Sequence, residues 1–351
     1  MDSTRRNFLA GSMLGAGVLA TGAHAAAADP SADRPLRVCV FADIHFRPGM
    51  FPHDNREHLE KIVARAKAAR CDFIIHLGDM VHNVRLPETK AYLDYYNDCG
   101  LPSYHVLGNH DQDESTWVEV RDAFHMPPDG YYAIDRGGFR FVVLDPNYFT
   151  DGAGRAYHFE NKNYWKRPKE GVINYIPPEQ LEWLRATVLE SPWPCCVLSH
   201  QSLERPPVGA GVMNKEAVLA IFDEANRRCP GRVRVAMNGH MHTDYQRLLG
   251  NVLYWDVNSA SNYWFPKAHD CFPDDYVRTH RGATHTLGWT EPLSAILTLW
   301  PNGRIRIEGS KAGWLYGVDP KKAGVYDVDE TARYITPEIR DLDISLNLRG
   351  C

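Results

Sequence analysis

The sequence lacks three features that would each point to a particular class of protein. It has no Cys-x-x-Cys pair, which argues against a zinc ribbon or a dithiol redox site. It has no block of basic residues, and 39 Lys and Arg against 44 Asp and Glu leave a net charge of -5, which argues against a dedicated nucleic-acid-binding protein. After the N-terminal leader-like segment, no apolar run approaches the length that crosses a membrane, and there is no internal repeat or low-complexity tract.

The N-terminal segment has the pattern of an export leader. Segment 3–9 contains Arg5-Arg6, a Gly- and Ala-rich apolar stretch follows, and Ala23-His24-Ala25 matches an A-x-A cleavage site. Because this pattern resembles twin-arginine leaders, we expect a signal peptide at 1–25, recognised by the twin-arginine export machinery, and a linker at 26–34. The mature protein would then be periplasmic or otherwise extracytoplasmic. An uncleaved anchor is the less favoured alternative, because the apolar run is short and rich in glycine.

The composition is that of a folded protein with a sizeable core. The chain has 351 residues, of which 44% are apolar, and this suits one large domain with elaborations. Eight cysteines in an exported protein raise the question of disulfides. Cys39, Cys195 and Cys196 lie in strand-like apolar runs, where Cys commonly serves as a small buried residue, so we expect at most one or two bridges.

Strand and helix patterns alternate along the chain after residue 34. The expected strands are 36–42, 73–77, 103–107, 195–199, 232–238 and 254–257, with hairpins formed by 131–135 and 139–145 and by 294–300 and 304–308. The expected helices include Leu59–Ala66, 88–97, one that begins at Pro177, and 214–227. This alternation predicts βαβ units with parallel strands. Three segments have little periodicity, and we expect a long loop at 146–176, a loop-like segment at 262–290 and a peripheral arm at 311–351.

Five short polar segments follow predicted strands directly. They are Asp43-Ile44-His45, Gly78-Asp79, Gly108-Asn109-His110-Asp111, His200, and Gly239-His240-Met241-His242. Sites in such sheets collect at the carboxyl ends of the strands, so these side chains are predicted to converge. Alternate residues of an extended segment face one side, and the glycines allow sharp turns. Imidazole, carboxylate and amide oxygen together suit Fe, Mn, Zn or Co better than Ca.

In order and residue type, these segments resemble the calcineurin-like metallophosphoesterase superfamily over about residues 36–258. The resemblance implies an α/β fold, a four-layer αββα sandwich of two mixed sheets flanked by helices. The catalytic domain would span 35–310, with a C-terminal peripheral extension at 311–351. It also implies a binuclear site with two divalent or trivalent ions, whose bridging hydroxide hydrolyses phosphate esters.

The same resemblance implies a role for each residue of the motifs. The first ion would be held by Asp43, His45, Asp79 and His242. The second would be held by Asp79, Asn109, His200 and His240. Asp79 would bridge the two ions. His110 would not be a ligand: it would contact a phosphate oxygen or protonate the leaving group, with Asp111 orienting it.

Several side chains keep more than one interpretation. His82 stands where purple acid phosphatases have a tyrosine, so the tyrosinate-to-iron charge transfer is not expected. His82 itself is an extra ligand, a substrate contact or, as we favour, a residue that supports the ligands without binding metal or lies on the surface. His76 lies on an apolar run and is given no role. Aromatic residues in the two irregular segments either stack on a substrate or form plain loops; they are Tyr157, His158, Tyr164, Trp165, Trp264, His269 and His285.

The substrate class also stays open. The motifs resemble class III cyclic nucleotide phosphodiesterases, and are also similar to phosphomonoesterases and nucleases of the superfamily. The acidic charge argues against a nuclease, so we favour a phosphodiesterase or broad phosphatase acting on small extracytoplasmic substrates. The alternative from another class is a non-catalytic metal-binding interaction protein. The sequence does not determine the oligomeric state or the identity of the metals.

Overall fold

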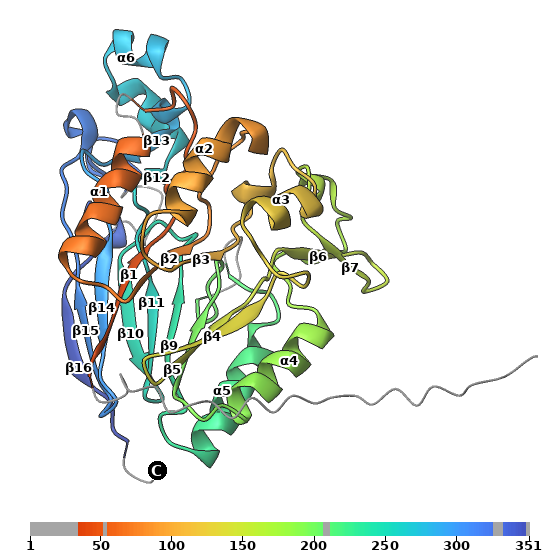
Figure 1. Ribbon diagram of the computed structural model, residues 1–351. Helices are drawn as coiled ribbons and strands as arrows, with labels where there is room; N and C mark the ends of the chain where they lie inside the picture. Colours follow the sequence, from red (N-terminus) through yellow and green to blue (C-terminus); the bar gives the residue numbers. More distant parts are fainter. Residues whose placement is uncertain (1–33, 52–54, 206–210, 326–332, 349–351) are drawn as a thin grey trace, which may run out of the picture.

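The computed structural model of this chain describes residues 34–51, 55–205, 211–325 and 333–348 (Figure 1). The predicted leader at 1–25 and all of the predicted linker except Arg34 lie outside the described residues. Two six-stranded sheets dominate the fold, and helices cover their outer faces. The predicted four-layer αββα sandwich is therefore confirmed.

The first sheet has the strand order β16-β15-β14-β1-β2-β3. Its strands are β1 (Leu36–Phe41), β2 (Phe73–Leu77), β3 (Ser103–Val106), β14 (Ala295–Leu299), β15 (Arg304–Glu308) and β16 (Leu342–Ser345). β1, β2 and β3 are parallel, while β14, β15 and β16 add antiparallel pairs, so the sheet is mixed. All five residues of β2 are buried, as expected for a strand that is covered on both faces.

The second sheet has the order β10-β11-β9-β8-β5-β4. Its strands are β4 (Tyr132–Arg136), β5 (Phe139–Val143), β8 (Cys195–Leu198), β9 (Val233–Asn238), β10 (Tyr245–Leu249) and β11 (Val252–Asp256). The four central strands are parallel and the two edge strands antiparallel. The largest apolar cluster fills the space between the sheets, where Phe73 and Phe141 meet edge to face at 5.0 Å.

Helices cover both outer faces because each has one apolar stripe. On the first sheet lie α1 (Asn55–Ala68), α2 (Leu86–Asn97) and α3 (Trp117–Ala123), and on the second lie α4 (Pro178–Leu189) and α5 (Lys215–Arg228). In α5 the buried residues are Val218, Ile221, Phe222 and Ala225, the spacing of one helix face. No helix among the described residues is long and apolar enough to cross a membrane.

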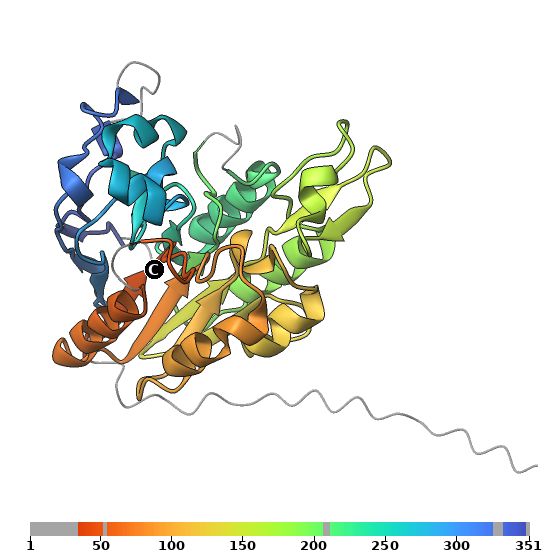
Figure 2. The same cartoon turned by 90° about the horizontal axis from the view of Figure 1, so that it is seen from above.

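Two segments expected to be loop-like contain short elements. The 146–176 segment holds the hairpin β6 (Tyr148–Thr150) and β7 (Ala156–His158) and the 3-10 helix η2 (Asn163–Lys166). The 262–290 segment holds β12 (Asn262–Trp264), η3 (Pro266–Cys271), α6 (Asp274–Thr279), η4 (Ala283–His285) and β13 (Thr286–Gly288), and β12 pairs with β13. Figure 2 shows these two insertions on opposite sides of the molecule as seen from above. Their strands are three residues long, too short for an alternating pattern to be recognised.

The C-terminal part contributes to the first sheet. β16 pairs with β15 as an edge strand, and Ile335, Ile339 and Leu346 are buried in the core between the sheets. A 3-10 helix, η5 (Leu315–Gly317), precedes it. The domain boundary at 310 stays a prediction. The seven described cysteines form no disulfide with one another, and Cys351 lies outside the described residues.

Candidate metal centre

The predicted site residues lie at neighbouring strand ends of the two sheets. Asp43 and His45 follow β1, Asp79 follows β2, and Asn109 and His110 follow β3. His200 follows β8, and His240 and His242 follow β9. The two sheets meet here, because Ala42 after β1 bridges Ser259 after β11, and the backbone N–H of Ala260 donates to the carbonyl of Ala42 at 2.8 Å.

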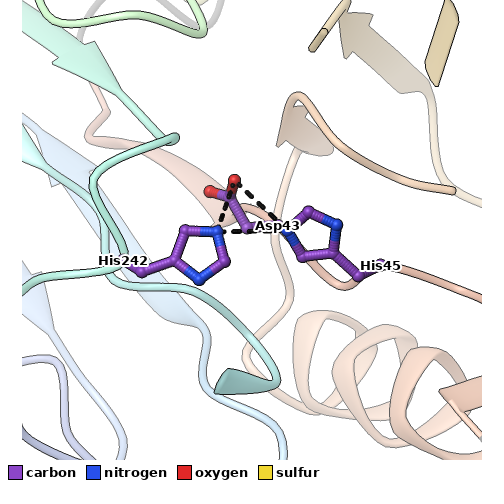
Figure 3. A group of neighbouring side chains, drawn as sticks. All are labelled: Asp43, His45 and His242. Carbon is purple, nitrogen blue, oxygen red and sulfur yellow. Dashed lines mark hydrogen bonds and ion pairs between the residues drawn. The ribbon is translucent and has the colours of Figure 1, made fainter. Parts of the chain in front are cut away.

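One triad is formed by Asp43, His45 and His242, whose side chains point toward one another (Figure 3). His242 Nε2 lies 3.2 Å from Asp43 Oδ1 and 3.1 Å from His45 Nε2. His45 Nε2 is 3.9 Å from the same carboxylate oxygen. All three residues are buried, so three ligand-type atoms face one point away from bulk water.

A second triad is formed by Asp79, His200 and His240. His200 Nε2 lies 3.1 Å from Asp79 Oδ2 and 3.2 Å from His240 Nδ1. The triads adjoin, since Asp79 Oδ2 is also 3.8 Å from His45 Nε2 of the first triad. Asp79 therefore lies where the two triads meet, as does Asp43, whose Oδ1 is 3.9 Å from His200 Nε2.

The backbone at these strand ends is unusual. Five of the predicted ligands have positive φ: Asp43, His45, Asp79, His240 and His242. A left-handed conformation costs a non-glycine residue about 1–2 kcal/mol, and such strain gathers at functional sites. The neighbouring glycines leave room for the ligands. A Cβ at Gly78 would lie 2.1 Å from His200 Nδ1, and one at Gly108 would lie 2.1 Å from Asp79 Oδ1.

Hydrogen bonds from outside the triads orient the ligand atoms. His200 Nδ1 lies 2.8 Å from the carbonyl of Leu77, and His242 Nδ1 lies 2.5 Å from the carbonyl of Asn262, so each Nδ1 donates and each Nε2 faces the triads. The other oxygens of both carboxylates accept backbone N–H groups: Asp79 Oδ1 from His110 at 2.8 Å and Asp43 Oδ2 from His240 at 2.9 Å.

The residues present fit a pair of metal ions. Asp43 Oδ1 and Asn109 Oδ1 are buried without a hydrogen-bond partner, which is costly for an oxygen unless a cation approaches it. The donor set of His nitrogens, two carboxylates and an amide oxygen suits Fe, Mn, Zn or Co. The electrostatics agree. Burial lowers the pKa of His200, but the Asp79 carboxylate raises it to about 9, so the site attracts positive charge.

Burial and nearby charges also act together on the pKa values of the neighbouring groups. Burial raises the pKa of Asp79, but His200 and His110 hold it well below its usual range, so this carboxylate stays ionised. Burial lowers the pKa of His45 well below its usual range and that of His240 to about 3. Neutral imidazoles are the form that binds metals.

His110 pairs with Asp113, and the expected pairing with Asp111 is wrong. His110 Nδ1 lies 2.6 Å from Asp113 Oδ2. Asp111 instead accepts backbone N–H groups from Asp79 at 3.0 Å, Val81 at 3.0 Å and Gly108 at 2.9 Å, and so ties the ends of β2 and β3 together. The 3-10 helix η1 (His110–Gln112) explains the choice, because residues three apart eclipse in such a helix. This spacing in His110-Asp-Gln-Asp113 is a signal that the sequence already contained.

The side chains whose role the sequence left open lie in different parts of the structure. His82 lies beside His110, with ring centroids 4.3 Å apart, and groups with His110 and Asp113 as a third set of ligand-type atoms. Trp264 is 5.3 Å from His45 by ring centroids, so β12 reaches the site. His76 is buried beside Phe41, with ring centroids 5.2 Å apart, and burial lowers its pKa to about 3.

The other histidines of open role, His158, His269 and His285, make contacts outside the triads. His158 pairs with Asp145 at 2.7 Å. His269 and His285 lie near each other on the 262–290 insertion. Ser259 and Ser261, in the turn after β11, both donate to the carbonyl of Asp43 and so support the first ligand.

Comparisons with known proteins identify a family and list solved structures similar to this chain. The family model of the calcineurin-like phosphoesterases matches residues 36–244. Among solved structures, a dimetal phosphatase from Danio rerio has a TM-score of 0.56 at 14% identity, over 89% of this chain and 99% of that one. A purple acid phosphatase from yellow lupin (Lupinus luteus) seeds has a TM-score of 0.47 at 14% identity, over 81% of this chain and 52% of that one. No curated protein sequence matches the chain.

At such low identity the structural likeness bears on the fold, while the family match covers more than half of the chain. That match begins at the first strand and includes every segment from which the two triads are built. The chain therefore belongs to the calcineurin-like phosphoesterase family and is a metallophosphoesterase.

Proposed function

We propose that this chain hydrolyses small phosphate esters, diesters or monoesters, at a two-metal site. The observation that carries the proposal is the pair of adjoining triads with Asp79 between them. Asp43, His45 and His242 would hold one ion, His200, His240 and Asn109 the other, and Asp79 both. Two such ions about 3.5–4 Å apart neutralise the charge of a phosphate and lower the pKa of bound water.

The protein's own groups would divide the remaining work. The buried carbonyls of Leu77 and Asn262 hold the imidazoles of His200 and His242 in one orientation, which lowers the cost of assembling the site. His110 stands at the edge of the triads with its side chain 20% exposed, so a substrate can reach it. A proton on His110 would go to the oxygen of the departing alcohol.

The cellular setting is part of the proposal. The twin-arginine pattern before Ala25 supports export of the folded, metal-loaded protein to the periplasm or another extracytoplasmic space. Small phosphate esters outside the cytoplasm would then be the substrates. Separating cytoplasmic and periplasmic fractions, with a variant in which Arg5 and Arg6 are both replaced by Lys, tests this. Equal export of that variant would argue against the twin-arginine route.

Metal content and turnover test the activity together. We would purify the chain without residues 1–25, and measure bound metal and the hydrolysis of bis-p-nitrophenyl phosphate and p-nitrophenyl phosphate. The expected result is about two ions per chain with turnover. The ratio of the two rates distinguishes a diesterase from a monoesterase. Absence of metal after reconstitution would refute the two-metal site.

A matched pair of variants strengthens this test. Asp79→Asn keeps the shape of the side chain but removes the bridging charge, so we expect turnover to fall by at least about 100-fold with loss of metal. Asp343→Asn alters an exposed carboxylate on β16 that pairs with Arg304, far along the chain from the triads, and should leave both quantities unchanged. Full activity and two ions in Asp79→Asn would contradict the assignment of the bridge.

A further inference from the structure

Hydrogen bonds and an ion pair connect the 146–176 insertion to the segment that carries His110. The backbone N–H of Asn161 donates to the carbonyl of Ser115 at 3.0 Å, and that of Trp117 donates to Glu160 Oε2 at 3.2 Å. Lys162 pairs with Glu114 at 2.6 Å. These contacts place the 3-10 helix η2 directly against the turn that follows His110.

At the centre of this contact, Tyr164 reaches the carboxylate that holds His110. The Tyr164 hydroxyl donates to Asp113 Oδ1 at 2.8 Å, and Asp113 Oδ2 pairs with His110 Nδ1 at 2.6 Å. Both Tyr164 and Asp113 are buried. Each oxygen of the carboxylate therefore has a fixed partner, and the carboxylate cannot rotate without breaking one of two hydrogen bonds.

Tyr164 is itself held in place by its surroundings. Its ring stacks on Phe159 at 4.3 Å, in a small apolar cluster with Phe149 and Ile173. Burial and the nearby Asp113 carboxylate raise the pKa of the hydroxyl, which therefore keeps its proton. The insertion thus contributes a fixed donor, built from residues about fifty positions away from His110 in the sequence.

We propose that Tyr164 is a positioning residue which acts through Asp113 to hold the imidazole of His110 in the orientation needed to protonate a leaving group. The inference rests on the proposed function. In the step concerned, a water oxygen forms a bond to phosphorus and loses a proton to solvent. The bond from phosphorus to the leaving oxygen breaks, and that oxygen keeps the electron pair and takes the proton of His110 Nε2. His110 then regains a proton from solvent.

The effect of disturbing His110 should depend on the leaving group of the substrate. An alkyl alcohol leaves poorly without a proton, whereas p-nitrophenolate is stable enough to leave as the anion. Disturbing His110 should therefore slow alkyl esters far more than nitrophenyl esters. Loss of fold or metal would slow both equally.

The test uses Tyr164→Phe, which removes one hydroxyl and keeps the stacked ring. Tyr157→Phe is the matched control on the same insertion, because the Tyr157 hydroxyl donates to Asp151 Oδ2 of the hairpin, at 3.2 Å, and not to Asp113. We expect kcat of Tyr164→Phe to fall about tenfold on an alkyl phosphate ester and less than about twofold on the p-nitrophenyl ester, with KM unchanged. The control should match the unaltered protein on both. Equal losses on the two esters, or no loss, would overturn the proposal.

A double-mutant cycle with Asp113→Asn checks the route. If Tyr164 acts through Asp113, the double variant should be no slower on the alkyl ester than Asp113→Asn alone. Additive losses would show that Tyr164 acts elsewhere. Metal content is measured in every variant, because the Tyr164 hydroxyl also lies within reach of Asn109. Loss of metal in Tyr164→Phe would overturn the positioning role.

One readout does not need turnover, and it separates this inference from the proposed function. The proton between His110 Nδ1 and Asp113 should give a low-field NMR signal, as short charge-assisted hydrogen bonds do. That signal is expected to shift in Tyr164→Phe and not in Tyr157→Phe. An unchanged signal would refute the inference even if the protein hydrolyses no ester, and an inactive protein with a shifted signal would refute only the proposed function.

Discussion

Residues with positive φ and glycines, which have no side chain, together make room for the ligands. Asp43, Asp79 and His240 each adopt a positive φ two residues after a strand ends. Positions 78, 108 and 239 have no room for a side chain, because a Cβ at any of them would lie within 2.5 Å of a ligand side-chain atom. At the scale of single residues, the site depends as much on these glycines as on the ligands.

The first prediction concerns Gly108. In Gly108→Ala the new methyl group would lie 2.1 Å from Asp79 Oδ1 and 2.3 Å from the Asp79 nitrogen, and the backbone cannot yield as a flexible side chain would. We expect overpacking to lower the unfolding free energy by about 1–3 kcal/mol and to displace the bridging carboxylate, with loss of metal. Chemical denaturation and metal analysis measure the two effects.

Gly152→Ala is the control for this prediction. Gly152 lies in the β6–β7 hairpin, and its nearest neighbour to a Cβ would be Glu170 at 3.6 Å, an ordinary contact. Its unfolding free energy should change by no more than about 0.5 kcal/mol, with metal retained. If Gly108→Ala behaved in the same way, the close packing of Gly108 on Asp79 would not matter to the site.

At the scale of elements, short insertions complete a site that the long strands begin. β12 supplies the Asn262 carbonyl that orients His242, and it places Trp264 near His45. The helix η2 supplies Tyr164 to Asp113. The central strands thus carry the ligands, and the insertions hold those ligands and their neighbours in position.

The second prediction concerns α3, which follows the segment that carries His110. Thr116 caps it with a full capping box, accepting from the Glu119 N–H while Glu119 Oε2 accepts from the Thr116 N–H at 2.8 Å. Thr116→Ala should lower the unfolding free energy by about 1 kcal/mol. Val118→Ala, at a side chain 53% exposed on the same helix, should change it by less than about 0.5 kcal/mol. Denaturant unfolding of the two variants decides whether the cap has this effect.

At the scale of the whole molecule, the two sheets meet at the metal centre. Asp43, His45 and Asp79 follow strands of the first sheet, and His200, His240 and His242 follow strands of the second. Each triad contains residues from both sheets. A bound ion would therefore join the two halves of the sandwich, in addition to the apolar core between them.

The third prediction follows from this arrangement. Removing metal with a chelator should lower the melting temperature, and returning Mn²⁺ or Zn²⁺ should restore it. Free metal at 100 times its Kd should add about 2.7 kcal/mol to the unfolding free energy. Calorimetry at several metal concentrations measures the slope. Asp79→Asn should respond less, because it lacks the bridge, and an equal response would place the stabilising ion elsewhere.

The sequence by itself determined the fold class and the strand ends that matter. Buried strands such as Phe73–Leu77 were predicted with the bounds observed, since continuous apolar runs are a local signal. The seven ligands that the family resemblance implies lie among the polar residues that end such runs, and parallel strands bring those ends to one edge. Which side chains contact one another is not encoded by such a local signal. Only the tertiary structure showed that Asp113, and not Asp111, pairs with His110, and that Tyr164 from a weakly patterned insertion contacts Asp113. The reason is that backbone turns and contacts between distant segments select which side chains meet.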